Sequence, residues 1–119
     1  MSYGVRRIDA FRAISSGAMT GNITSTVVDI RGISHIGVQF IFTGTPTGTF
    51  TIECSNDYGE NGSSATWEPI TTSPATISAS GSAGDHLISL NSIPFGWLRA
   101  VYTFSSGTGT LNCYITGKE

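Results

Sequence analysis

Apolar and polar residues alternate along several short segments of the chain, and a period of two predicts β-strands with one face in a core. In residues 34–43 every second residue is large and apolar: Ile36, Val38, Phe40 and Phe42. Phe50, Ile52 and Cys54 continue this pattern after residues 45–48, whose Pro46 and Gly48 are turn formers. This region predicts a β-hairpin.

Turn-forming residues separate further apolar segments at regular spacing. The pattern predicts additional strands at residues 23–30, 66–72, 75–80, 86–90, 97–104 and 111–115. No strong amphipathic helix follows residue 20, which excludes a doubly wound α/β fold. The sequence therefore predicts an all-β fold, a two-sheet antiparallel sandwich of about eight strands, either jelly-roll or immunoglobulin-like.

Two segments of this predicted sandwich resemble each other. Residues 42–50 and 104–111 each run from an aromatic residue through a Gly/Thr turn to Gly-Thr and an apolar residue. A cysteine follows in each of the two returning strands, Cys54 and Cys113, at a position that the alternation predicts to face the core. We interpret the two segments as hairpins with the same turn chemistry, because a repeat protein needs at least three units.

The amino-terminal segment differs from the rest of the chain. Residues 1–20 contain three arginines and one aspartate, whereas the remainder contains three basic and seven acidic residues. Ile8, Phe11 and Ile14 have the spacing of one helical face. We expect residues 1–21 to form an arm that docks on a neighbouring subunit, and residues 22–119 to form the sandwich domain; the alternatives are a first edge strand or a disordered end. The partner-binding residues expected in this arm are Tyr3, Arg6, Arg7, Ile8, Phe11 and Arg12.

Composition narrows the possible partners. Charged residues make up 12% of the 119 residues, against about 25% in typical domains. The net charge of −2 predicts neither a nucleic-acid nor an anionic membrane partner. No apolar stretch approaches the ~20 residues of a membrane span. The absence of a secretory signal pattern predicts synthesis in a cytoplasm, where Cys54 and Cys113 stay reduced. We expect buried free thiols rather than a disulfide.

Candidate chemistry is sparse. Residues 56–62 offer oxygen ligands for calcium but lack EF-hand spacing, so an ordinary polar loop is the preferred interpretation. The chain has two histidines, His35 and His86; Asp85 and His86 are neighbours in a predicted strand and point to opposite faces, so they cannot easily act together. No serine lies in a Gly-x-Ser-x-Gly motif. We expect no enzymatic activity, no cofactor and no metal.

Four aromatic residues form a second candidate site. Tyr58, Trp67, Trp97 and Tyr114 would make a platform for sugar rings if their faces were exposed. Aromatic residues in a sandwich are more often part of the core or cover its edge. The carbohydrate interpretation thus depends on how these side chains are placed.

A resemblance rests on two parts of the chain. Residues 43–52, followed by Ser55-Asn56-Asp57 and Trp67, and the ending 93–102, continuing through 106–111 to 117–119, resemble small β-sandwich proteins encoded among the structural genes of tailed bacteriophages. The resemblance covers about two thirds of the chain and concerns turn and strand patterning. The chain departs from it in the longer loop at residues 58–65.

The resemblance implies a virion component. It implies a capsid decoration (cement) protein that binds the major capsid protein lattice as a homo-oligomer, with a trimer expected by analogy. A head–tail connector, tail or fibre position is also compatible. The alternative function is a carbohydrate-binding or host-adhesion module of a phage tail or fibre.

Overall fold

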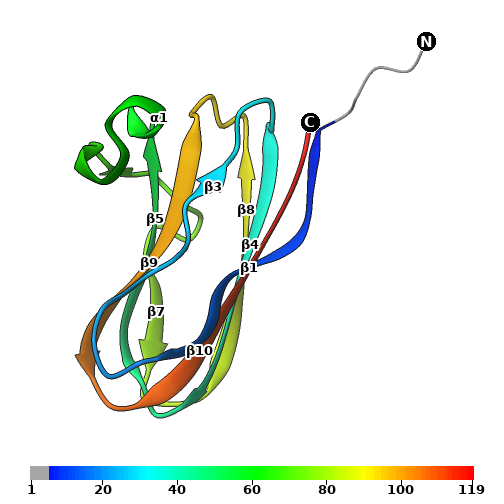
Figure 1. Ribbon diagram of the computed structural model, residues 1–119. Coiled ribbons are helices and arrows are strands. Elements are labelled where there is room, and N and C mark those ends of the chain that lie inside the picture. Colours follow the sequence, from blue (N-terminus) through cyan, green and yellow to red (C-terminus); the bar gives the residue numbers. More distant parts are fainter. Residues whose placement is uncertain (1–5) are drawn as a thin grey trace.

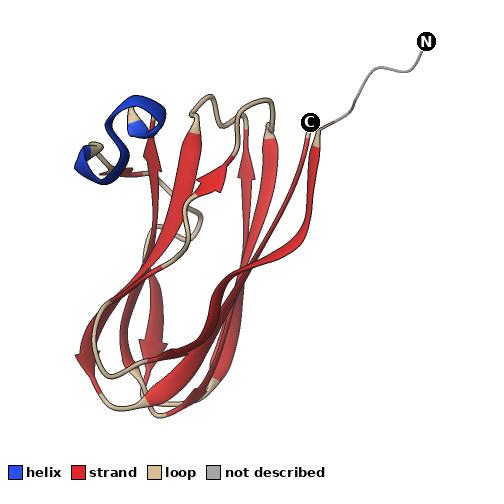
Figure 2. Ribbon diagram, in the orientation of Figure 1, coloured by secondary structure: helices blue, strands red, loops and turns tan. Residues whose placement is uncertain are grey.

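The computed structural model describes residues 6–119, which fold into two β-sheets packed face to face (Figure 1). The first five strands are β1 (Arg7–Ala18), β2 (Ile23–Thr24), β3 (Val28–Asp29), β4 (His35–Gly44) and β5 (Thr47–Ser55). Two short helices follow, α1 (Tyr58–Asn61) and the 3₁₀-helix η1 (Gly62–Ser64). The remaining strands are β6 (Glu68–Pro69), β7 (Ile77–Ser80), β8 (Gly84–Asn91), β9 (Trp97–Ser106) and β10 (Gly109–Lys118). Strands dominate throughout (Figure 2).

The strand order is that of a jelly roll. The four-stranded sheet has the order β1-β10-β4-β8, and the six-stranded sheet has the order β2-β9-β5-β6, with β3 beside β9 and β7 beside β5. The short strands β2 and β3 pair with successive parts of β9 and act as one interrupted strand, and β6 and β7 do the same along β5. Counted in this way there are eight strand positions, and every connection except β5 to β6 crosses between sheets. The predicted antiparallel sandwich is confirmed, and its topology is jelly-roll rather than immunoglobulin-like.

The two predicted hairpins are wrong. β4 pairs with β10 and β8, whereas β5 pairs with β9, β6 and β7, so the turn after Gly44 carries the chain from one sheet to the other. The turn between β9 and β10 does the same. Alternation cannot distinguish these cases, because it shows which face is buried and not which strand lies alongside. The two similar turns instead contact each other, with the Thr45 amide donating to the Thr108 carbonyl at 2.8 Å.

The core lies between the sheets and contains the predicted alternating residues. Phe40 of the four-stranded sheet stacks on Phe50 of the six-stranded sheet with ring centroids 4.5 Å apart. Cys54 and Cys113 are both buried and unbridged, and they belong to opposite sheets. Burial raises the pKa of Cys54 to about 11 and that of Cys113 to about 12. The prediction of buried free thiols is confirmed.

The predicted boundary between an arm and the domain is wrong within the described residues. Residues 7–18 form β1, which pairs with β10 at the edge of the four-stranded sheet, and Ile14 is buried in the core. This corresponds to the edge-strand alternative. Ile8, Phe11, Ile14 and Gly17 pair with every second residue of β10, namely Gly117, Ile115, Cys113 and Leu111.

Repeated bulges explain the helix-like spacing of this segment. Each three-residue step along β1 matches a two-residue step along β10, so one extra residue enters β1 at each of three register shifts. A spacing of three between apolar residues therefore arises in a bulged strand, where it resembles the periodicity of a helix.

Candidate binding surface on the four-stranded sheet

The register of the four-stranded sheet aligns its outward-facing side chains in rows that cross all four strands. One row consists of Arg12, Tyr114, Gln39 and Leu87. A second row crosses β4 four residues earlier, at His35, and consists of Arg7, Lys118, His35 and Asn91. The row between them contains only small side chains on three strands: Thr116, Gly37 and Ser89.

Large side chains on both sides of a row of small ones leave a shallow groove across the sheet. Depressions of about 610 Å³ and about 330 Å³ lie on either side of this middle row and share Ala10, Gly37 and Thr116. A Cβ atom on Gly37 would lie 3.0 Å from the Thr116 Oγ1 atom, so a larger residue would crowd the floor. We call this surface, with its two flanking rows, the outer-face groove.

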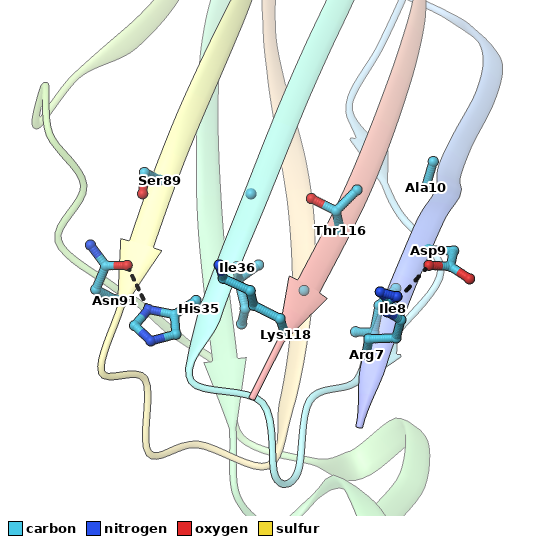
Figure 3. Close-up of a pocket in the computed structure, with 12 residues that line it drawn as sticks. Arg7, Ile8, Asp9, Ala10, His35, Ile36, Ser89, Asn91, Thr116 and Lys118 are labelled. Atoms are coloured by element: carbon cyan, nitrogen blue, oxygen red, sulfur yellow. Dashed lines mark hydrogen bonds and ion pairs between the residues drawn. The ribbon is translucent and has the colours of Figure 1, made fainter. Parts of the chain in front are cut away.

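Polar and charged side chains line one wall of the outer-face groove (Figure 3). The His35 Nδ1 atom lies 3.0 Å from the Asn91 Oδ1 atom, and the two side chains point toward each other across β4 and β8. Arg7 and Asp9 form a loose ion pair at 3.9 Å, and both are largely exposed. Exposed pairs of this kind contribute little to stability. Their charges remain accessible to a binding partner.

The opposite wall is more apolar. Tyr114 is held by Arg12, which donates to the tyrosine oxygen at 2.7 Å and lies 5.2 Å from the ring centroid. Leu87, at 77% the most exposed large apolar side chain of residues 6–119, lies at the other end of the same row. The exposed Ile41 also lines this depression.

The exposed apolar side chains are unevenly distributed between the sheets. Within residues 6–119 the exposed large apolar residues are Phe11, Ile41 and Leu87, and all three belong to the four-stranded sheet. Ile41 and Leu87 lie on the outer face, whereas Phe11 pairs with the core-facing Ile115. Exposed apolar groups that lie together on one face, with polar groups around them, are typical of an interaction surface.

The outer face of the six-stranded sheet carries an internal aromatic cluster instead. Tyr58 of α1 lies between Trp67 and Trp97, with ring centroids 5.8 Å and 5.9 Å away. The Arg99 guanidinium lies 4.4 Å from the Trp67 ring centroid, and that of Arg31 lies 4.8 Å from the Trp97 ring centroid. The two tryptophans thus each have one ring face covered by the protein itself.

Two aspartates fix the segments that carry this cluster. Asp57 accepts hydrogen bonds from the Ser55 hydroxyl at 2.7 Å, the Asn61 amide group at 2.9 Å and the Thr66 backbone at 3.0 Å. These bonds, led by that from Ser55, lower the Asp57 pKa. Asp29 accepts two hydrogen bonds from the Arg31 side chain, which hold the pKa of its carboxyl far below the usual range. The Asp57 oxygens of the candidate calcium loop are therefore engaged in structural bonds.

The structure separates the predicted partner-binding residues. Tyr3 lies outside the described residues. Arg7 and Ile8 line one end of the outer-face groove, Arg12 forms part of its apolar wall, and Phe11 lies on the same strand. Arg6 is engaged elsewhere, with an ion pair to Asp29 at 3.3 Å and a hydrogen bond to the Arg31 carbonyl.

Sequence reasoning also missed much of the groove. It assigned no role to Gln39, Ile41, Leu87 or Asn91, and it grouped Tyr114 with the three aromatic residues of the other sheet. The sequence did contain a signal. The outward-facing residues of β4 and β8 are polar or small, and Ile41 and Leu87 are the large apolar exceptions.

The two histidines lie on opposite faces of the four-stranded sheet. His35 is exposed on the outer face, whereas His86 is partly buried beside Phe42 and Phe50. The His86 Nε2 atom lies 2.7 Å from the Ser78 carbonyl oxygen of β7, which ties the edges of the two sheets together. The outer-face groove therefore offers hydrogen-bonding groups, charges and apolar contacts, which are the means of binding a partner.

Comparisons with known proteins bear on the fold. No protein-family model matches the sequence, and no curated protein matches it significantly. The structure is similar to that of the prophage-derived protein YomS of SPBc2, with a TM-score of 0.55 and 10% sequence identity over 98% of this chain and 97% of that one. The K1 cleaved adhesin domain of Lys-gingipain from Porphyromonas gingivalis has a TM-score of 0.40 and 12% identity over 92% of this chain and 72% of that chain.

The first of these similarities supports the all-β fold along nearly the full chain. The described part of the chain contains no helix of the length and hydrophobicity that crossing a membrane requires.

Proposed function

We propose that this protein is a non-enzymatic virion structural protein of a tailed bacteriophage. In this proposal it is a capsid decoration (cement) protein that binds the major capsid protein lattice through the outer-face groove. The observation that carries the proposal is the placement of the exposed Ile41 and Leu87 together on the outer face of the four-stranded sheet, beside the groove. The fold shared with a prophage-derived protein is compatible with it.

The composition of the groove supports protein binding. Interfaces typically combine an apolar and aromatic centre with a polar rim, and Tyr and Arg are enriched among the residues that dominate their energies. Tyr114, Arg12 and Leu87 supply the first kind of contact, and the row containing His35 and Lys118 supplies the second. The groove is shallow, which suits a broad protein surface better than a small ligand.

Weak binding through the outer-face groove would be sufficient for attachment, because a capsid lattice presents the same binding site many times. Sites on a capsid lattice recur, so an oligomer of this protein would engage several at once, and weak individual contacts would add to stable attachment. A homo-oligomer in the virion remains part of the proposal. The partners are then capsid proteins.

A matched pair of variants tests the proposal. Ile41→Lys adds a charge to the outer face of the four-stranded sheet, and Thr49→Lys adds the same charge to an exposed position on the outer face of the six-stranded sheet. Each protein is mixed with particles that lack it, and the bound fraction is measured by co-sedimentation. We expect at least a tenfold loss of affinity, about 1.4 kcal/mol, for Ile41→Lys only. Equal binding by both variants would contradict the proposal.

The aromatic cluster does not favour the carbohydrate alternative. A sugar platform needs free ring faces, whereas Arg99 covers a face of Trp67 and Arg31 covers a face of Trp97. The two tryptophans also contact Tyr58 at tilted angles, so the three rings do not form a flat surface. A polysaccharide pull-down with Trp67→Ala as control distinguishes the two functions, because only saturable binding lost in that variant supports adhesion to a glycan.

A further inference from the structure

The sandwich has four lateral edges, and three of them are poor templates for pairing with another strand. β1 is interrupted by three register shifts, and its Ala13 carbonyl already accepts a hydrogen bond from the Thr26 amide. β2, β3 and β6 have two residues each, and β7 has four. Bulges and short strands are common ways in which proteins protect sheet edges from association.

The fourth edge, β8, lacks these protections. It has eight residues that pair with β4 in one unbroken register from Asn91 to Gly84. Among residues 6–119, β4 is the only strand with which it pairs, and no loop donates or accepts a backbone hydrogen bond on its other side. It contains neither Lys nor Pro, and its centre carries the exposed Leu87.

We propose that β8 is a self-association edge, at which two copies of this chain pair antiparallel about a two-fold axis at Leu87. The two four-stranded sheets would then form one continuous eight-stranded sheet. This inference does not rest on the proposed capsid function, because it concerns only the protein with itself.

The sequence of β8 is self-complementary in this register. Leu87 of one copy lies opposite Leu87 of the other, so the most exposed apolar side chain is covered by its own equivalent. Asp85, the only acidic residue of β8, lies opposite the neutral Ser89, which avoids like-charge repulsion. In this register the odd-numbered residues of one copy pair with odd-numbered residues of the other. Because the odd-numbered residues of β8 face outward, the outer faces of both copies lie on the same side of the joined sheet. These features favour a second copy over an unrelated strand.

The pairing is expected to be reversible. A single strand pair buries less surface than the roughly 1,200–2,000 Å² of stable interfaces. Association should therefore depend on protein concentration, with a species of twice the chain mass of 12.5 kDa. A two-fold pair also differs from the trimer expected by analogy, and the measured mass distinguishes the two.

Sedimentation equilibrium of the full chain provides the first test. Leu87→Lys places two like charges opposite each other at the axis and should abolish the dimer. Thr43→Lys adds the same charge to an exposed outward position of the interior strand β4, and this control should dimerise like the unaltered protein. A protein that stays monomeric at all concentrations, a trimer, or equal dimerisation of both variants would overturn the inference.

Cross-linking tests the register itself. Paired Cα atoms lie about 4.5–5.5 Å apart, within disulfide reach, so Leu87→Cys should form a cross-linked dimer on mild oxidation. Asp85→Cys alone should not, because its two copies lie about 14 Å apart along the strand, whereas a mixture of Asp85→Cys and Ser89→Cys proteins should cross-link. The buried Cys54 and Cys113 make the unaltered protein a suitable blank. Equal cross-linking in all samples, or none in any, would contradict this register.

Discussion

The two outer faces of the sandwich differ in whether their large side chains pack against other residues of the protein. On the six-stranded sheet, Tyr58 packs against Trp67 and Trp97, and Arg99 pairs with Glu53 at 2.8 Å. On the four-stranded sheet, Ile41 and Leu87 remain exposed beside a groove of small side chains. On the six-stranded sheet the large side chains contact other residues of this chain, whereas on the four-stranded sheet they are available to a partner.

The difference shows that the kind of residue matters less than its surroundings. Aromatic residues are the usual candidates for a binding site, yet the aromatic cluster anchors a loop of the chain itself. The less conspicuous Leu87 and Ile41 are the ones that remain exposed on an outer face. Measurements that separate stability from attachment can therefore sharpen or break this comparison.

The largest expected effect is the loss of β1. Deleting residues 1–17 removes Ile14 from the core and uncovers the side of β10, so the protein should fail to fold. Loss of a buried Ile side chain alone costs about 2–5 kcal/mol. Deleting residues 1–5 keeps β1 and serves as the control. Circular dichroism during heating measures the outcome, and a cooperatively folded protein after the longer deletion would contradict the assignment of β1 to the core.

The next effect concerns the aromatic cluster on the outer face of the six-stranded sheet. Trp97→Ala removes the ring that contacts Tyr58 and Arg31, and we expect a loss of about 2 kcal/mol in the free energy of unfolding, below the roughly 3–5 kcal/mol of a fully buried aromatic residue. Urea denaturation measures this loss, whereas binding to particles should not change. Tyr114→Ala is the matched variant on the other face. It should lower particle binding more than stability, and the reverse outcome would exchange the roles of the two faces.

A smaller effect should appear in acid. The pKa values of Asp29 and Asp57 are lowered in the folded protein, so these groups bind fewer protons folded than unfolded. Their contribution to stability is complete above the unfolded pKa of about 3.9 and decreases as the pH falls toward the lower folded values. Asp57→Asn should flatten this acid dependence, as measured by urea denaturation between about pH 5 and pH 2. An unchanged acid dependence would mean that the loop contributes nothing to it.

The smallest effect is on the thiols. Because burial raises the pKa values of Cys54 and Cys113 to about 11 and about 12, neither should react with a thiol reagent at neutral pH in the native protein. Both should react after unfolding. Rapid reaction of the native protein would show that one sheet opens near its cysteine.

Much of the fold was predictable from the sequence because alternation records which residues face the core. Residues such as Phe40, Phe42 and Ile52 were placed inward correctly. The strand order was not predictable, since the turns after Gly44 and Ser106 have the same local chemistry whether the next strand pairs alongside or crosses to the other sheet. The bulges of β1 likewise gave Ile8, Phe11 and Ile14 a helical spacing.

The candidate site was predictable only in part. Arg7, Ile8 and Arg12 were selected for their charge and position, and they do border the outer-face groove. Their neighbours in the rows, such as Gln39 and Leu87, come from strands far apart in the sequence. Only the register between β10, β4 and β8 brings them together, and that register depends on long-range pairing.

The most direct test of the difference between the two faces is hydroxyl-radical footprinting of the protein free in solution and attached to particles. We predict that attachment protects Tyr114 and Ile41 from oxidation and leaves Trp67 and Trp97 as reactive as in the free protein. Protection of the two tryptophans, with Tyr114 unchanged, would contradict the account.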